Sequence, residues 1–366
     1  MADKRIEKLA QILIQYSLGI KPGDQLEIRT NPLAQELALV AYKEAINAGA
    51  NVMINLGFQI GEEIFYKYAG EDQLDYVSPV RKLITETFDA MLVIGAEFNT
   101  RALSGVDPKR IARSRKANSE ITQIFLERAA KLDLRWCYTE FPTEASAQEA
   151  DMSLNDYQDF VYSAGYLNKE DPVSFWQKEG EKQKQLISWL TGKDRVDLKG
   201  ANVDLSFSIK DRIFKEADGK NNFPDGEIFT GPVEDSANGW IRFSYPAIYE
   251  GQEVIDVELW FEDGKVVKET ASKGKELLTS SLNTDEGARF LGEWGIGTNY
   301  GIDRFTKNIL FDEKMGGTIH LALGSGYPET GSMNTSAIHW DMLCNMEESE
   351  ILVDGELFYR NGKFKV

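Results

Sequence analysis

The sequence has few of the residues that define several large classes of protein. Only two cysteines and two histidines occur among its 366 residues. Cys137 and Cys344 are far apart along the chain, so they cannot build a disulfide framework or a thiolate metal site. A reducing compartment suits so few cysteines, and we therefore expect a cytoplasmic protein.

Long apolar runs are also missing. No stretch of about 18 consecutive apolar residues occurs, so we expect no membrane span and no membrane partner. The first 20 residues carry charges every few positions and lack the apolar core of a signal peptide. They read instead as an amphipathic helix, whose apolar stripe is formed by Ile6, Leu9, Ile12, Leu13 and Tyr16.

Positive charge is in the minority. The 59 acidic residues outnumber the 41 basic ones, which gives a net charge of −18 and a pI near 4.7. Because nucleic-acid phosphates attract a basic surface, we expect no nucleic-acid partner. The glycine-rich fingerprints of dinucleotide and P-loop sites are absent too.

The length favours two domains, since a single core rarely grows to this size. In the first half, short apolar runs alternate with helical patterns, which predicts a mostly parallel sheet with crossover helices. The predicted strands are 24–30, 51–57, 88–96 and 134–139, and the predicted helices are 32–49, 108–131, 143–149, 153–163 and 171–191. We assign residues 1–195 to an α/β N-terminal domain.

Strand patterns dominate the remainder of the chain. The runs at 203–209, 240–246, 254–267 and 356–366 indicate antiparallel strands, with hairpin turns at Asp263-Gly264 and Asn361-Gly362. Helical pieces are fewer and are expected chiefly at 274–282 and 285–292. We assign residues 196–366 to an α+β C-terminal domain that binds metal.

Both histidines of the chain fall within one short segment of this domain. His339 and Asp341 are two residues apart in SAIHWDML, so in a strand they share one face and can grip a single ion. His320 belongs to another strand-like run, TIHLALG, and Tyr327 follows beyond two glycines. Imidazole nitrogen and carboxylate oxygen together are typical ligands of Zn²⁺, Co²⁺ and Mn²⁺.

Three glutamates occur in surroundings that favour partial burial. Glu227, Glu293 and Glu313 are flanked by apolar residues and glycines, in GEIFTGP, FLGEWGIG and LFDEKMGG. A buried carboxylate is costly unless a cation or hydrogen bonds compensate it. Each glutamate alone is explained as readily by a hydrated turn or helix end, so the metal prediction depends on the whole set.

The C-terminal half resembles the thermophilic-type metalloaminopeptidases, the family that includes aminopeptidase T and aminopeptidase S. The motifs that carry the resemblance are GEIFTGP (226–232), DEGARFLGE (285–293), LFDE (310–313), HLALGSGYP (320–328) and NTSAIHWD (334–341). Their order and approximate spacing agree over about 115 residues, and weaker similarity, including PTEASAQEA at 142–150, extends into the first half.

The resemblance implies a co-catalytic pair of divalent ions, Zn²⁺, Co²⁺ or Mn²⁺. The implied ligands are Glu227, Glu293, Glu313, His320, His339 and Asp341. Glu293 is the implied bridge between the two ions. Glu313 and Tyr327 are the implied catalytic residues, the first as a proton carrier and the second as a ligand or hydrogen-bond donor to the reacting carbonyl.

Two segments depart from the family pattern. The stretch from Glu313 to His320 is two residues longer than expected, which leaves Glu313 as either ligand or proton carrier. The loop between Tyr327 and His339 is short, so the site is expected to be more open or differently shaped.

The implied activity is the removal of N-terminal residues from peptides with a free N-terminus, by means of a metal-activated water. Homodimerisation is implied by the resemblance only. Two alternatives stay open: a mononuclear enzyme with a 2-His-1-carboxylate iron site, and an inactive peptidase-like binding protein.

Overall fold

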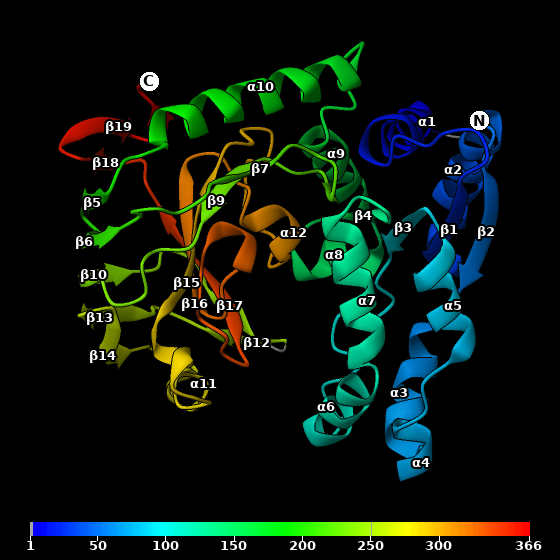
Figure 1. Ribbon diagram of the computed structural model, residues 1–366, viewed down its shortest axis with the longest axis horizontal. Coiled ribbons are helices and arrows are strands. Elements are labelled where there is room, and N and C mark those ends of the chain that lie inside the picture. Colours follow the sequence, from blue (N-terminus) through cyan, green and yellow to red (C-terminus); the bar gives the residue numbers. More distant parts are fainter. Residues whose placement is uncertain (1–2, 250) are drawn as a thin grey trace. The chain divides into compact units, whose positions relative to one another are not determined.

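The computed structural model describes residues 3–249 and 251–366, and it divides into two compact units (Figure 1). The first unit comprises Met1–Val173 and Gly219–Pro224, and the second comprises Ser174–Asp218 and Asp225–Val366. The expected domain limit at residue 195 falls inside the second unit. Among the described residues, no helix is both long and apolar enough to span a bilayer.

A parallel sheet of five strands forms the centre of the first unit. Its order is β2 (Asn51–Leu56), β1 (Gln25–Thr30), β3 (Ala90–Gly95), β4 (Arg135–Glu140) and β8 (Asn222–Phe223). Every neighbouring pair is parallel, which confirms the predicted α/β class. The inner strands β1 and β3 are almost wholly buried, as continuous apolar runs require.

Helices connect these strands. Asp3 caps the N-terminal amphipathic helix, which runs on as a π-helix over Ile12–Ser17 and packs on α2. The helices of the unit are α1 (Lys4–Gln11), α2 (Gln35–Asn47), α3 (Gln59–Tyr68), α4 (Glu71–Leu74), α5 (Pro79–Thr87), α6 (Pro108–Ala117), α7 (Ser119–Ala130), α8 (Glu144–Glu149) and α9 (Leu154–Ala164). The predicted helix over 108–131 is therefore two helices, which meet at Asn118.

The second unit contains an antiparallel sheet of eight strands. Its order is β14 (Lys265–Thr270), β13 (Glu258–Glu262), β10 (Asn238–Arg242), β6 (Val203–Ser208), β5 (Arg195–Gly200), β18 (Ser349–Val353), β19 (Glu356–Arg360) and β20 (Lys363–Phe364). The long helix α10 (Pro172–Leu190) packs on it, with the Trp189 ring stacked 5.0 Å from that of Phe358 (Figure 1). Positive φ angles at Asp263, Gly264, Asn361 and Gly362 confirm both predicted hairpin turns.

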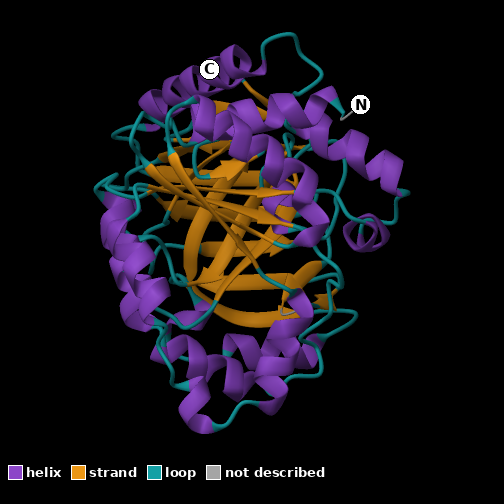
Figure 2. Ribbon diagram, turned by 90° about the vertical axis from the view of Figure 1, so that its right-hand side faces the viewer, coloured by secondary structure: helices purple, strands orange, loops and turns teal. Residues whose placement is uncertain are grey.

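A second antiparallel sheet in this unit contains residues of four of the five motifs named above. Its order is β17 (His339–Asn345), β16 (Thr318–Gly324), β15 (Leu291–Gly297), β9 (Glu227–Thr230) and β7 (Lys215–Ala217). A small hairpin joins β11 (Ala247–Tyr249) and β12 (Gln252–Val254), and the helices are α11 (Lys275–Leu282) and α12 (Ile309–Asp312). Helices and strands are distinguished by colour in Figure 2. The unit is mostly antiparallel, as predicted.

One predicted element is wrong. Residues 285–292 do not form a helix, because only Gly287–Arg289 make a 3₁₀ turn before β15 begins at Leu291. All seven residues of β15 are buried between β16 and β9, so tertiary pairing overrides the local helical pattern.

The core of the second unit lies between its two large sheets. Buried side chains of both sheets belong to one hydrophobic cluster, with Trp294 of β15 in edge contact with Phe207 of β6 at 5.2 Å. Because β15 and β16 are buried along their whole length, the polar side chains that they carry are held in rigid surroundings.

Candidate metal centre

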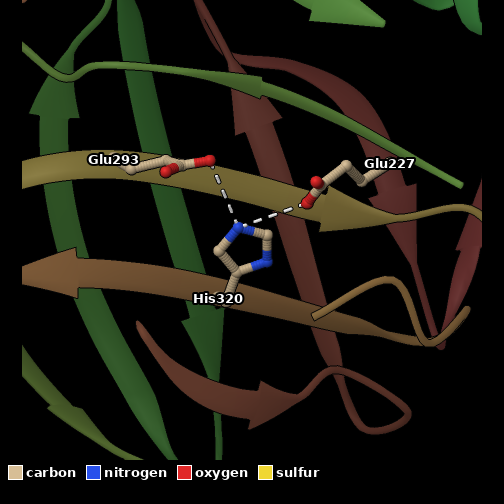
Figure 3. A group of neighbouring side chains, drawn as sticks. All are labelled: Glu227, Glu293 and His320. Atoms are coloured by element: carbon tan, nitrogen blue, oxygen red, sulfur yellow. Dashed lines mark hydrogen bonds and ion pairs between the residues drawn. The ribbon is translucent and has the colours of Figure 1, made fainter. Parts of the chain in front are cut away.

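Four neighbouring strands of the five-stranded sheet in the second unit supply five of the six predicted metal ligands. Glu227 begins β9, Glu293 lies in β15 and His320 lies in β16, and their side chains point toward one another (Figure 3). His339 and Asp341 follow on β17. Strand pairing thus brings together residues that lie more than 100 positions apart in the sequence.

His320 is the centre of one half of the site. Its Nε2 atom lies 3.3 Å from Glu227 Oε2 and 3.5 Å from Glu293 Oε1. All three side chains are buried. One ligand atom from each residue lies within 4.8 Å of the others, so the three can hold one ion.

His339 is the centre of the other half. Its Nε2 atom lies 3.3 Å from Asp341 Oδ2 and 3.4 Å from Glu293 Oε2. As predicted, residues two apart on β17 present their side chains on one face. Ligand atoms of Glu293, His339 and Asp341 also lie within 4.8 Å of one another, as do those of Glu313, His320 and Asp341.

Glu293 belongs to both halves. One carboxylate oxygen lies next to His320 and the other next to His339. A register shift between Leu291 and Glu293 in the pairing of β15 with β16 places it there. Such a bulge changes the direction in which a side chain points. Only glycine fits at position 292 of this bulge, because a Cβ there would meet the Gly324 carbonyl oxygen at 2.3 Å.

The histidines present the same ring nitrogen to the carboxylates. His320 Nδ1 lies 3.1 Å from the Glu313 carbonyl oxygen, and His339 Nδ1 lies 2.7 Å from that of Ser325. A carbonyl oxygen only accepts, so each Nδ1 carries the proton and donates it. Each Nε2 is therefore the nitrogen left for a metal ion, with its ring oriented by a backbone carbonyl.

The separations fit ligands around an ion better than direct hydrogen bonds. The four histidine-to-carboxylate distances are 3.3–3.5 Å. Ligands at about 2.0–2.1 Å from a tetrahedral ion lie about 3.3–3.4 Å apart. In addition, Glu227 Oε2 and Asp341 Oδ1 are buried oxygens that accept no hydrogen bond from the described residues. Such oxygens need a partner, and a divalent ion suits them.

The charges of the site favour cations. Burial alone would lower the pKa of His320 and His339, but the nearby carboxylates outweigh it and raise the values to about 10 and about 12. Burial raises the pKa of Glu227 to about 8 despite the attraction of Lys314. For Asp341 the charge of His339 outweighs burial and lowers the pKa to about 2. Without metal, protons on the two histidines therefore compensate part of the negative charge of the carboxylates.

Glu313 lies beside both halves, at the C-terminal end of α12. Burial raises the pKa of its carboxyl group above the ordinary value, and the charge of Lys314 opposes that rise. Its side chain contacts the ammonium of Lys314, and one of its carboxylate oxygens lies within 4.8 Å of ligand atoms of His320 and Asp341. This position is compatible with either role expected for Glu313, ligand or proton carrier.

Tyr327 stands at the edge of the site and is 42 % exposed. Its ring lies 5.4 Å from that of His339 and 5.6 Å from that of Phe229. Burial, followed by the charges of Glu293 and Asp341, raises the pKa of its hydroxyl well above the usual value. The hydroxyl is therefore protonated at neutral pH and available as a hydrogen-bond donor.

Three residues of the site were not predicted from the sequence. Gly295 faces His320 across the strand pair, and a Cβ there would lie 2.1 Å from the imidazole Nε2. Lys314 and Asp225 are buried next to the candidate ligands. Lys314, like the three glutamates, is flanked by apolar residues and glycines, and this pattern favours burial of a charged side chain.

The chain is similar to known proteins along almost its whole length. The chain matches the thermophilic metalloprotease family (M29) over residues 2–364. It is 26 % identical to aminopeptidase 2 of Geobacillus stearothermophilus, with 99 % of this chain and 98 % of that protein covered. It is 25 % identical to aminopeptidase T of Thermus thermophilus, with 98 % and 96 % covered.

A solved structure has the same fold. The wild-type AmpT structure from Thermus thermophilus superposes with a TM-score of 0.87 at 23 % identity, and 99 % of each chain is covered. The resemblance seen in the motifs is thus confirmed over the whole chain. This chain belongs to the thermophilic metalloprotease family M29.

Proposed function

We propose that this chain removes N-terminal residues from peptides at a dinuclear centre built on Glu293. The family identifies the enzyme class, a metal-dependent hydrolase, and the relatives named above are aminopeptidases. The observation that carries the dinuclear proposal is the shared carboxylate. Its two oxygens lie 3.5 Å from His320 Nε2 and 3.4 Å from His339 Nε2.

We assign the ligands by half-site. His320 and Glu227 would hold one ion, His339 and Asp341 would hold the other, and Glu293 would bridge them. Zn²⁺, Co²⁺ and Mn²⁺ suit this set of nitrogen and oxygen donors. When bound, such ions lower the pKa of water toward 7 and polarise a carbonyl group.

Glu313 is the proposed proton carrier. Its carboxyl group is partly buried, and its pKa is raised above the ordinary value, which favours proton exchange. In peptide hydrolysis the oxygen of water forms a bond to the carbonyl carbon and the carbon–nitrogen bond breaks. Glu313 would take the proton from water and deliver it to the departing nitrogen.

Tyr327 is the proposed donor to the reacting carbonyl. Its ring is oriented by Phe229 and His339, and its hydroxyl keeps its proton at neutral pH. A donor aimed at the developing negative charge stabilises the transition state more than the substrate.

The alternatives predicted from the sequence fare less well. In an iron site of the 2-His-1-carboxylate type, both imidazoles bind one ion. Here His320 pairs with Glu227 and His339 with Asp341, and the two imidazoles lie next to opposite oxygens of Glu293. An inactive relative is disfavoured because every proposed ligand side chain is one that binds metal.

A free α-amine is the substrate feature that this acidic centre is best suited to recognise. The test uses a pair of peptides that differ only in N-acetylation. We expect release of the first residue from the free peptide, no cleavage of the acetylated one, and loss of all activity after chelation. Zn²⁺, Co²⁺ or Mn²⁺ should restore it.

Equal cleavage of both peptides would show that the amine is not recognised and that the enzyme is another hydrolase. Full activity of the metal-free protein would contradict the proposal as a whole.

A cytoplasmic homodimer is part of the same proposal. The chain has only two cysteines, which suits a reducing compartment. The edge strand β2 carries no charged side chain, and α3, the next element along the chain, exposes Ile60, Ile64 and Tyr68 along one stripe. Light scattering after chromatography tests the dimer, and Ile64→Lys should yield monomers.

A further inference from the structure

Lys314 is a buried cation beside the candidate ligands. Its side chain is 0 % exposed, and its ammonium contacts Glu313 and lies 3.4 Å from Glu227 Oε1 and 4.0 Å from Asp225 Oδ1. A buried charge is costly unless it is paired, and here three carboxylates compensate it. The proposed reaction gives this residue no role.

The backbone holds Lys314 in place. Its N–H donates to the Phe311 carbonyl at 3.1 Å, and its own carbonyl accepts from Asn299 N–H at 3.1 Å. The next residue packs tightly against β15, because a Cβ at Gly297 would lie 2.0 Å from the Met315 carbonyl oxygen. The ammonium therefore has a fixed place, unlike that of a surface lysine.

This placement makes the two half-sites unequal. Glu227 directs Oε2 toward His320 and Oε1 toward Lys314, so one carboxylate serves an imidazole and an ammonium at once. Among the described residues, no ion pair links Lys314 to Asp341, and the nearest partners of Asp341 and Glu293 are the histidines. The ammonium thus pairs directly with the His320 half-site, and its charge lowers the pKa of Asp341 less than the charges of the two histidines do.

We propose that Lys314 sets the order of metal binding. The inference depends on the dinuclear centre proposed above. The first ion binds at His339, Asp341 and Glu293, and the second binds more weakly at His320, Glu227 and Glu293. The ammonium repels the second ion and also compensates part of the negative charge of Glu227, and both effects weaken the binding of that ion.

The expected difference between the two metal affinities follows from other metal sites, where residues that contact the ligands without binding the metal have been changed. Their change typically alters metal affinity by about 10- to 100-fold. We expect a separation of about that size between the two affinities. Activity should then follow occupancy of the weaker half-site, so the free metal concentration would regulate the enzyme.

The test is a titration of metal-free protein with Co²⁺, followed by calorimetry and by the visible absorption of the bound ion. Wild-type protein should show two binding events about 10- to 100-fold apart. His320→Ala should abolish the weaker event and His339→Ala the tighter one. Neither readout depends on activity.

Substitutions at position 314 then test whether the charge of Lys314 causes the difference between the two affinities. Lys314→Met should tighten the weaker event until the two affinities converge, whereas Lys314→Arg should keep them apart. Lys193→Met is the matched control, because Lys193 is also ion-paired in this unit, 2.8 Å from Glu356, and contacts no candidate ligand. It should leave both events unchanged.

Each outcome decides the inference. Two equal affinities in the wild type would overturn it, as would an unchanged separation in folded Lys314→Met. If Lys314→Met does not fold, the wild-type titration with the two histidine variants still decides. A wild type that binds no divalent ion would instead refute the proposed function itself.

Discussion

At the residue scale, glycines determine where the ligands can lie. Gly295 has no side chain at the point where the His320 ring crosses β15, and a Cβ there would meet imidazole atoms at 2.0–2.1 Å. Contacts below 3.0 Å do not occur for real Cβ atoms, so either the strand or the imidazole must move. The strand is buried along its length, so the imidazole is the part that yields.

Gly295→Ala should therefore displace His320 and remove one bound ion. We also expect a loss of stability of about 1–3 kcal/mol from overpacking. Metal analysis and denaturant unfolding measure the two effects. Gly61→Ala is the control, because its Cβ would meet nothing within 4 Å on α3, and it should leave metal content unchanged. Two ions retained in Gly295→Ala would contradict the geometry described for His320.

Tyr327→Phe tests a single hydroxyl. The ring contacts with His339 and Phe229 survive the change, so the fold and the metal content should be kept. The rate should fall by about 10²- to 10³-fold if the hydroxyl stabilises the developing charge. Tyr300→Phe is the comparison, because that hydroxyl donates to the Gly362 carbonyl and should affect stability alone. A normal kcat in Tyr327→Phe would remove the tyrosine from the reaction.

At the scale of elements, the loop before β17 is anchored to the turn before β15. Asp285 accepts hydrogen bonds from Ala337 N–H at 2.7 Å and from the Ser336 hydroxyl at 2.8 Å, and also caps Ala288 N–H at 2.9 Å. This carboxylate thus ties together the segments that lead into Glu293 and His339.

These hydrogen bonds, first of all that of Ala337, lower the pKa of Asp285 below its usual value of 3.8. A depressed pKa stabilises the fold above the unfolded value, and the contribution disappears as pH falls through the folded value. Asp285→Asn should therefore lower the unfolding temperature by about 2–4 °C at neutral pH, and by less at acid pH.

Differential scanning calorimetry at two pH values makes this measurement. Asp303→Asn is the matched control, because Asp303 pairs only with the adjacent Arg304 among the described residues and is exposed. An equal effect of Asp285→Asn at both pH values would show that the charge of the carboxylate is unimportant.

Most elements were predictable because their patterns are local. The strands around His320 and His339 follow the two-residue period, and the hairpin at Asp263-Gly264 follows from turn chemistry. The helix predicted over 285–292 is wrong because the spacing of its apolar residues imitates a helix, while burial between two neighbouring strands makes Leu291–Gly297 extended. Only the three-dimensional pairing contains that information.

In the candidate site too, some features were predictable from local sequence and others depend on tertiary contacts. The six predicted ligands lie together, although their roles stay predictions. The backbone partners of the two histidines, the bulge at Glu293 and the cation at Lys314 depend on contacts between distant segments. No spacing within the sequence specifies them.

At the scale of the whole molecule, the first unit is an α/β layer structure and the second, a mostly antiparallel unit, holds all the candidate ligands. Parallel and antiparallel sheets require different sequence patterns, which is why the change of character along the chain was visible. The proposed chemistry depends on one feature of the second unit, the carboxylate shared by two histidine half-sites.

The most direct test is the number of ions bound per chain, at a metal concentration that saturates both half-sites, in wild type and in Glu293→Gln. We predict two ions in the wild type, because each half-site has its own histidine and carboxylate. An amide lacks the charge and the second oxygen of the bridge, so Glu293→Gln should bind both ions poorly and lose nearly all turnover. His320→Ala, with circular dichroism to check folding, should lose one ion only. Two tightly held ions and near-normal activity in Glu293→Gln would contradict the bridging role.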